Sequence, residues 1–196
     1  PSQPSQSSQK MKITVPDSLA DITVKQYKAL ADIKLDENST DWLLESISIL
    51  CNLTKKQVGT LTIPETERIS LIIAKLNNED ENNQELQQKI KYKGKRYGFH
   101  PNLSKLTVGE FADLETFCGG GFFKNLNEIL CILYRPIKSE GGDFYTIEKY
   151  EGDTFPNYWD DLKMSVVLGA VNFFLSIGVT LTKDLANSLA GAEKEI

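Results

Sequence analysis

The sequence has few of the residues on which metal sites and nucleophilic enzymes depend. Its 196 residues include one histidine, His100, and three widely separated cysteines, Cys51, Cys118 and Cys131. Structural zinc sites use four His or Cys ligands, commonly with a C-x-x-C pair, and this sequence has no such pair. An odd number of distant cysteines argues against a disulfide framework and fits a reducing compartment. We therefore expect no metal ion and no other cofactor.

The single histidine leaves one pair for nucleophilic catalysis, His100 with Cys118. His100 precedes a proline and is expected in an exposed turn. Cys118 ends an apolar helix face and is expected to be a packed, inert thiol. We predict that the chain is not an enzyme and keep this pair as the enzymatic alternative. The residues expected on the buried helix face are Phe111, Leu114, Phe117 and Cys118.

Strong positive charge is also lacking. The formal net charge is -5, so the chain as a whole is not a general binder of polyanions. The first ten residues have no apolar run and are not expected to be a secretory signal. Residues 164–182 contain no charge, but polar residues and two glycines interrupt them. We expect a buried core helix there, with a membrane span as the less favoured alternative.

The composition divides the chain into four parts. Residues 1–10 are almost entirely Pro, Ser and Gln and are expected to form a flexible arm. Residues 11–76 are expected to form an N-terminal helical lobe. Residues 77–87 begin with nine polar or acidic residues and are expected to be a linker. Residues 88–196 are expected to form a C-terminal α+β lobe.

In the N-terminal lobe, the alternation over residues 11–15 predicts a short strand that a proline ends. Thr23 with Gln26, and Thr54 with Gln57, have the spacing of capping boxes and predict two helix starts. A helix is also expected over residues 42–50. Another is expected from Pro64, which suits a first helical turn.

In the C-terminal lobe, residues 89–99 predict a hairpin that turns at Gly94. Helices are expected over 107–117, ended by Gly119–Gly121, and over 126–133. A second hairpin follows, with Pro136 expected on an edge strand and residues 144–150 on the return strand. A long helical region is expected over 156–189. The fold class is thus α+β and mostly helical, with two small hairpins on a C-terminal helical core.

The first hairpin carries the most distinctive charge pattern. No acidic residue occurs between Leu86 and Gly109, and the basic residues alternate with apolar ones. Alternation places the lysines on the solvent face and the aromatic rings on the opposite face. We favour a solvated edge, with contact to an acidic protein as a second option and a nucleic-acid platform as a third. The candidate contact residues are Lys89, Lys91, Lys93, Lys95 and Arg96 here, with Lys138 and Phe144 on the second hairpin.

Several motifs occur in a suggestive order. They are Tyr97-Gly98-Phe99, Pro101-Asn102-Leu103, Leu106 to Phe111 with Asp113-Leu114, Leu130 to Ile137, Tyr145 to Gly152 and Val166 to Phe174, together with Ile13 to Asp17 and Thr23 to Tyr27. Through these motifs the chain resembles tailed-bacteriophage tail-assembly and baseplate-associated proteins, including T-even-type baseplate hub components and their marine relatives. The match covers most of residues 11–180, while CGGGFF at 118–123 and the acidic linker are atypical.

The resemblance implies a non-enzymatic virion protein of the tail or portal-proximal region that acts through protein–protein contacts. It implies other phage structural proteins as partners, in a homo- or hetero-oligomeric ring or complex, without a small-molecule substrate. The expected location is the virion, and the host cytoplasm during assembly. The alternatives are a tail or baseplate assembly chaperone that leaves before maturity, and a nucleic-acid-binding accessory protein that uses the basic hairpin.

Overall fold

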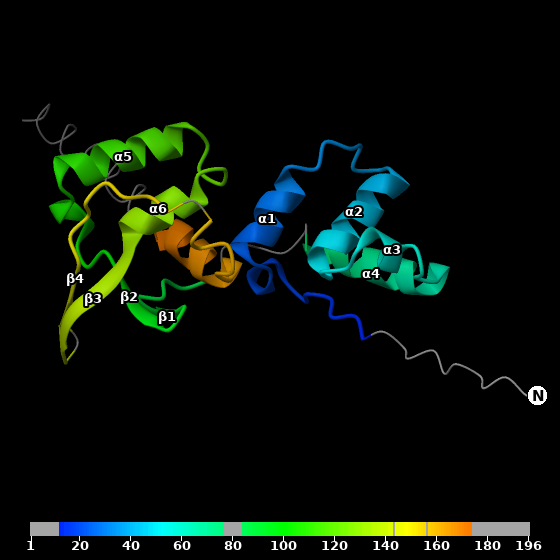
Figure 1. The fold of residues 1–196 in the computed structure, drawn as a ribbon, viewed down its shortest axis with the longest axis horizontal. Helices are drawn as coiled ribbons and strands as arrows, with labels where there is room; N and C mark the ends of the chain where they lie inside the picture. The colour runs from blue at the N-terminus through cyan, green and yellow to red at the C-terminus, as the bar shows by residue number, and fades with distance from the viewer. Residues whose placement is uncertain (1–11, 77–83, 143, 156, 174–196) are drawn as a thin grey trace, which may run out of the picture.

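The computed structural model describes residues 12–76, 84–142, 144–155 and 157–173 (Figure 1). They form helices and one four-stranded antiparallel sheet, which confirms the α+β class. Helices α1 to α4 lie in one half, and α5, α6 and the sheet lie in the other (Figure 1). The predicted arm and the end of the predicted last helix fall outside the described residues.

The N-terminal half consists of short capped helices. The two predicted capping boxes are both present, because each Thr hydroxyl accepts from the backbone N–H of the Gln three residues later. The predicted strand is wrong: residues 12–15 form no strand, and Ile13 and Val15 pack against the core instead. Alternation marks a face but supplies no partner strand. The elements are η1 (Leu19–Asp21), α1 (Val24–Ala31), α2 (Thr40–Leu50), α3 (Lys55–Val58) and α4 (Ile63–Leu76).

The C-terminal half contains the sheet, with strand order β1-β2-β3-β4. The two predicted hairpins are present, and pairing between β2 and β3 joins them into one sheet. The helical region predicted from residue 156 begins only at residue 164, because residues 157–161 form a turn and Lys163 forms a β-bridge with Thr23; the described part of this helix covers residues 164–173. The elements are β1 (Lys89–Tyr92), β2 (Lys95–Phe99), η3 (Leu103–Lys105), α5 (Val108–Gly119), α6 (Leu126–Leu133), β3 (Tyr134–Gly141) and β4 (Phe144–Ile147).

Pro136 was expected on an edge strand, and this is wrong, because β3 lies inside the sheet between β2 and β4. The carbonyl of Pro136 accepts the backbone N–H of Glu148 at 2.9 Å, one residue beyond the end of β4. A strand residue directs its nitrogen and oxygen to the same side. Pro136 therefore lacks its N–H on the side of β4, at the point where the hydrogen bonds between β3 and β4 end. The proline removes no hydrogen bond from that pairing.

The core of this half lies between one face of the sheet and the helices. Trp159 is buried and stacks on Tyr92 with ring centroids 4.9 Å apart, and it meets Tyr97 edge-on at the same distance. The side-chain oxygen of Asn127, on α6, accepts the backbone N–H of Trp159 at 2.7 Å. A buried amide whose bonds are made fixes one ring position rather than several.

Backbone bonds join the two halves at the start of α1. The N–H of Val24 donates to Leu162 O at 2.9 Å, and the N–H of Met164 donates to Ile22 O at 2.8 Å. Thr23 and Lys163 form an antiparallel bridge. Gln26 then bonds the carbonyls of Ile49 and Leu50, at the end of α2. The capping box of α1 is therefore held by both halves of the chain.

The helix of residues 164–173 occupies the described part of the long uncharged stretch. Within the residues that the structure describes, no helix is long and apolar enough to cross a membrane. Its Gly169 lies against the end of the predicted linker, because a Cβ there would come within 2.8 Å of the Glu85 carbonyl carbon. Asn172 donates to Gln84 O at 3.2 Å on the same side.

Replacing Gly169 by alanine should therefore destabilise the fold. The new methyl group has no free space, so we expect Gly169→Ala to lower the free energy of unfolding by about 1–3 kcal/mol. Gly109→Ala is the matched control, since Gly109 is also helical and nothing lies within 4 Å of its Cβ position. It should be neutral or stabilise by up to about 1 kcal/mol. Urea denaturation measures both; equal effects would contradict the packing argument.

Candidate protein-contact surface

The first hairpin forms as its sequence predicts. Lys93 and Gly94 both have positive φ, 45° and 78°, as a type I′ turn between two hairpin strands requires. Ile90 and Tyr92 are buried, and Lys91 is exposed. The predicted division into a basic outer face and an apolar inner face is confirmed for these residues.

The basic charges of this hairpin are partly neutralised by one residue of the second hairpin. Glu140, on β3, accepts from Lys89 at 2.7 Å and also pairs with Arg96. The hydrogen bond from Lys89, followed by the charge of Arg96, holds the pKa of Glu140 below its ordinary value. Glu140 thus ties the β1–β2 hairpin to the outer part of β3.

The remaining basic residues differ in their surroundings. Lys93 donates to Tyr158 O at 2.9 Å and lies 3.9 Å from the Asp161 carboxylate. Lys91 and Lys95 are exposed and make no ion pair with the described residues. Both lysines are therefore open to a partner, but on opposite faces of the sheet, because Lys91 lies opposite Arg96 and Lys95 lies opposite the buried Tyr92.

The aromatic residues of the hairpin are not available for base stacking. Tyr92, Tyr97 and Phe99 are all buried on the core side of the sheet. A single-strand platform needs ring faces that bases can reach. Binding of a nucleic acid to this hairpin would therefore depend on the positive charges alone, because these rings cannot stack on bases.

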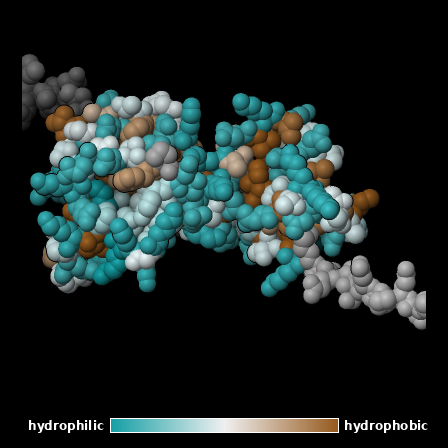
Figure 2. Space-filling model, in the orientation of Figure 1, coloured by the Kyte–Doolittle hydropathy of each residue, from teal (hydrophilic) through white to brown (hydrophobic). Residues whose placement is uncertain are grey.

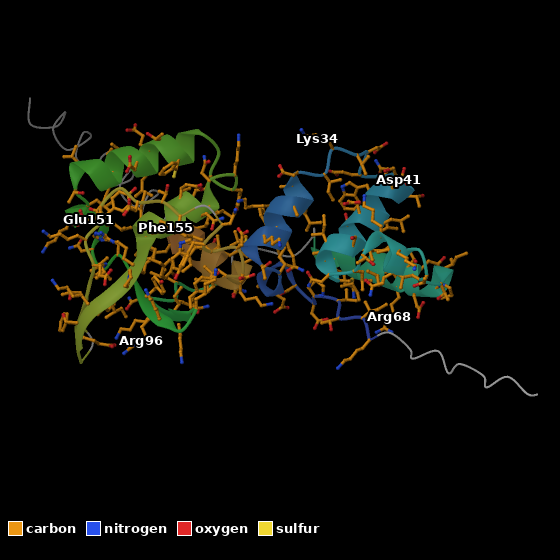
Figure 3. The ribbon with its side chains drawn as sticks, viewed as in Figure 1. Lys34, Asp41, Arg68, Arg96, Glu151 and Phe155 are labelled. Carbon is orange, nitrogen blue, oxygen red and sulfur yellow. The ribbon has the colours of Figure 1, made fainter. Side chains whose placement is uncertain are left out.

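The second hairpin brings an apolar side chain to the same region. Lys138 is exposed, and Phe144, opposite Gly141 near the hairpin tip, is 83% exposed. We call these residues and the first hairpin's charges the hairpin surface: Lys89, Lys91, Lys93, Lys95, Arg96, Lys138, Glu140 and Phe144. Arg96 marks its position at the lower end of the C-terminal half (Figure 3).

Tyr145, next to Phe144, fixes the second hairpin over the first. Its hydroxyl donates to Phe99 O at 2.6 Å, and a Cβ on Gly98 would run into its ring. The ring can lie across β2 only because residue 98 has no side chain. Sequence reasoning missed Tyr145 and Glu140, although a glycine inside a strand is a recognised sign of close approach by another group.

A buried ion pair joins α5 to β3. The Glu110 carboxylate pairs with Arg135 at 2.6 Å, and its other oxygen accepts the backbone N–H of Thr107 at 2.6 Å. Glu110 and Arg135 are 3% and 7% exposed. Burial raises the pKa of Glu110, but the bonds from Thr107 and the charge of Arg135 lower it more, so the net shift is downward.

His100 was expected in an exposed turn, and this is wrong, because its side chain is buried beside the pair. Its Nδ1 accepts the backbone N–H of Asn102 at 3.3 Å. Burial lowers the pKa of His100, and the positive charge of Arg135 lowers it further. The backbone N–H of His100 donates to Leu133 O at 2.7 Å, at the end of α6, a long-range contact that sequence spacing alone did not reveal.

Cys118 was expected to be packed, and this is also wrong, because the thiol-bearing residue is exposed in the last turn of α5. Phe111 is exposed too, whereas Leu114 is buried. His100 lies near Glu110 in the first turn of the same helix. Eight residues of helix separate Glu110 from Cys118, about 12 Å along the axis. The structure therefore does not bring the His100–Cys118 pair together.

A third contact completes the connection between the motifs singled out in the sequence. Tyr150 donates to Asp113 at 2.8 Å. With the Gly98–Tyr145 and Glu110–Arg135 contacts, it links four motifs that are separate in the sequence. Across the described residues, no cluster of three or more His, Cys, Asp or Glu side chains is placed to hold a metal ion.

Comparison with known proteins identifies no relative: no family model, no curated protein and no solved structure matches this chain.

The buried histidine makes a specific prediction about pH. A histidine whose folded pKa is lowered binds its proton more readily in the unfolded chain, so stability falls as pH drops below the unfolded value of about 6.5. His100 is the only histidine in the sequence. We expect the free energy of unfolding to fall between pH 7 and 5.5 with a slope of at most about 1.4 kcal/mol per pH unit from this group.

His100→Gln should remove this slope, because the amide can keep an acceptor near Asn102 without titrating. Glu110 also makes the stability fall as the pH drops, but in a lower pH range. Its ionised form stabilises the fold, and this stabilisation is lost only as the pH falls below about 4.5. Urea denaturation at several pH values measures the slopes. If the variant keeps the same slope of unfolding free energy between pH 7 and 5.5, then groups other than His100 cause that slope.

Proposed function

We propose that this chain is a non-enzymatic bacteriophage virion protein of the tail or portal-proximal region that acts through protein–protein contacts. The observation that supports the proposal best is the composition of the hairpin surface. Exposed lysines and a nearly fully exposed phenylalanine occur together on a surface held by Glu140 and Tyr145. A rigid apolar side chain among charges is a common form of protein contact site.

The charge pattern narrows the kind of partner. Lys91, Lys95 and Lys138 are exposed, and Glu140 already neutralises part of the positive charge. The surface therefore fits a partner that is acidic at its rim and offers an apolar recess for Phe144. Electrostatic attraction of this kind speeds and orients association more than it adds affinity.

The sequence resemblance supports the phage assignment. The residues that carry it, in the motifs around Gly98, Glu110, Arg135 and Tyr145, contact one another in the fold. These structural contacts are enough to account for the sequence motifs. The motifs therefore do not require a catalytic role for any of these residues. The first alternative is an assembly chaperone absent from the mature virion, which would use the same surface.

Mass spectrometry of purified, DNA-filled virions from the phage that encodes the chain tests this proposal. We expect the chain in virions at several to a dozen copies. Its presence in infected cells but not in virions would instead favour the chaperone. Finding that its removal leaves virion yield and tail morphology unchanged would overturn both.

A variant test addresses the surface itself. Phe144→Asp combined with Lys138→Glu should reduce incorporation or infectious yield at least about tenfold, because it places a charge in the apolar contact and reverses another. Leu71→Asp is the matched control, since Leu71 is also a large exposed apolar residue but lies on α4 in the other half. Both variants should keep the wild-type circular dichroism spectrum. Equal losses in both would remove the hairpin surface from the proposal.

A further inference from the structure

A second feature of the C-terminal half shares only Lys95 with the hairpin surface. A cavity of about 390 Å³ lies between the strands β2 and β3 and the segment of residues 148–155. This volume is in the range of pockets that hold small ligands or single side chains. Figure 3 shows Glu151 and Phe155 on the part of the C-terminal half that faces α5 and α6, away from Arg96. Hydrophilic residues cover most of the visible surface, and hydrophobic ones occur in separate patches (Figure 2).

The accessible walls of the cavity are aromatic. Tyr150 and Tyr158 are half-buried, and Phe155 is 58% exposed. The rings of Phe155 and Tyr158 have centroids 6.2 Å apart and planes inclined by 53°. The Tyr158 ring already has the Lys93 ammonium over it, 4.9 Å from the ring centroid, so one of these rings accepts a cation within the protein itself. The face of an aromatic ring carries partial negative charge.

The floor of the cavity is fixed by hydrogen bonds. Trp159 donates its indole N–H to the Cys131 sulfur at 3.3 Å and meets Tyr158 at 88°. The hydroxyls of Tyr97 and Tyr158 bond each other. The carbonyl of Tyr158 also accepts from Tyr92 at 2.8 Å. The walls are therefore positioned before any ligand arrives, which lowers the entropic cost of binding.

The charges at the rim favour a cation by a small margin. Glu148, Glu151 and Asp153 line the cavity, against Lys95 and Lys149. Arg135 also lines the cavity, but its charge is already matched by Glu110 at 2.6 Å. Burial is the main cause that raises the pKa of Tyr97 and of Tyr150, and the charges of Glu148 and Asp153 act in the same direction to a smaller extent.

We propose that this cavity binds an organic cation, an alkylammonium or guanidinium group, between Tyr150, Phe155 and Tyr158 and beneath the carboxylates of the rim. Cation–π attraction in such a site contributes about 0.5–1 kcal/mol per ring when exposed and more when water is excluded. An anion would meet the negative faces of the rings. The feature that favours an anion is Arg135 Nε, which has no hydrogen-bond partner among the described residues, so an anionic probe belongs in the test.

NMR titration of the full chain with tetramethylammonium chloride tests the proposal. The two tryptophans give an internal comparison, because Trp159 forms the cavity floor and Trp42 lies on α2 in the other half. We expect saturable shifts of the Trp159 indole signal and none at Trp42. 3,3-Dimethylbutan-1-ol, a neutral probe with a tert-butyl group, and sodium acetate should bind at least about threefold more weakly.

Phe155→Ala should raise the Kd for tetramethylammonium about two- to fivefold, as the loss of one exposed cation–π contact implies. Glu151→Gln should raise it in the same direction, and the effect should shrink at high salt. Phe144→Ala is the matched control, since it removes an equally large exposed ring outside the cavity, and should leave the Kd unchanged. Phe155 and Glu151 are exposed, so these variants are expected to fold, and an unchanged Trp159 signal without ligand verifies it.

The source of the cation is distinguished by a second pair of probes. N-acetyl-lysine methylamide binding more tightly than choline would indicate a side chain of a partner protein, and the reverse order would indicate a free small amine. Either result supports the cation site. Tighter binding of acetate or of the neutral alcohol, or the absence of any Trp159 shift, would overturn it. None of these outcomes depends on whether the chain is a virion protein.

Discussion

The arrangement of the C-terminal half depends on the buried pair between Glu110 and Arg135. Glu110 occupies the N3 position of the capping box at the start of α5. It is also the ion-pair partner of Arg135, on the internal strand β3. One carboxylate therefore fixes both where α5 begins and how it lies on the sheet. A buried pair adds little net stability over apolar residues, but breaking it by removing one partner costs about 3–5 kcal/mol. An arrangement that separated α5 from β3 would leave a buried charge unpaired.

Gln26 has the corresponding structural role in the N-terminal half. It closes the capping box of α1 with one end and binds the final carbonyls of α2 through its amide nitrogen. The sequence around Gln26 resembles that around Glu110, and in both places the capping side chain makes a long-range contact. A neutral amide suits carbonyl acceptors, and a carboxylate suits a guanidinium. The two residues differ as their partners require.

One glycine allows the two hairpins to pack against each other. Because Gly98 has no side chain, Tyr145 can cross β2 and hold the second hairpin, with Phe144 beside it, over the first. The hairpin surface and the aromatic cavity thus lie on a scaffold fixed by contacts between distant segments. Phe144, Phe155 and most of the charged side chains of these surfaces are exposed, whereas Trp159 and the Glu110–Arg135 pair are buried, so substitutions of the exposed residues test binding with little effect on folding.

The sequence by itself determined the local structure: the helix starts at Thr23, Thr54 and Thr107, the turn at Gly94 and the α+β class, because caps, turns and alternation act within a few residues. Only the tertiary structure decided the burial of His100, the exposure of Cys118, the interior position of Pro136 and the contact of Tyr145 with Gly98. These depend on which distant segment covers each face, and one element's own pattern does not specify its neighbour.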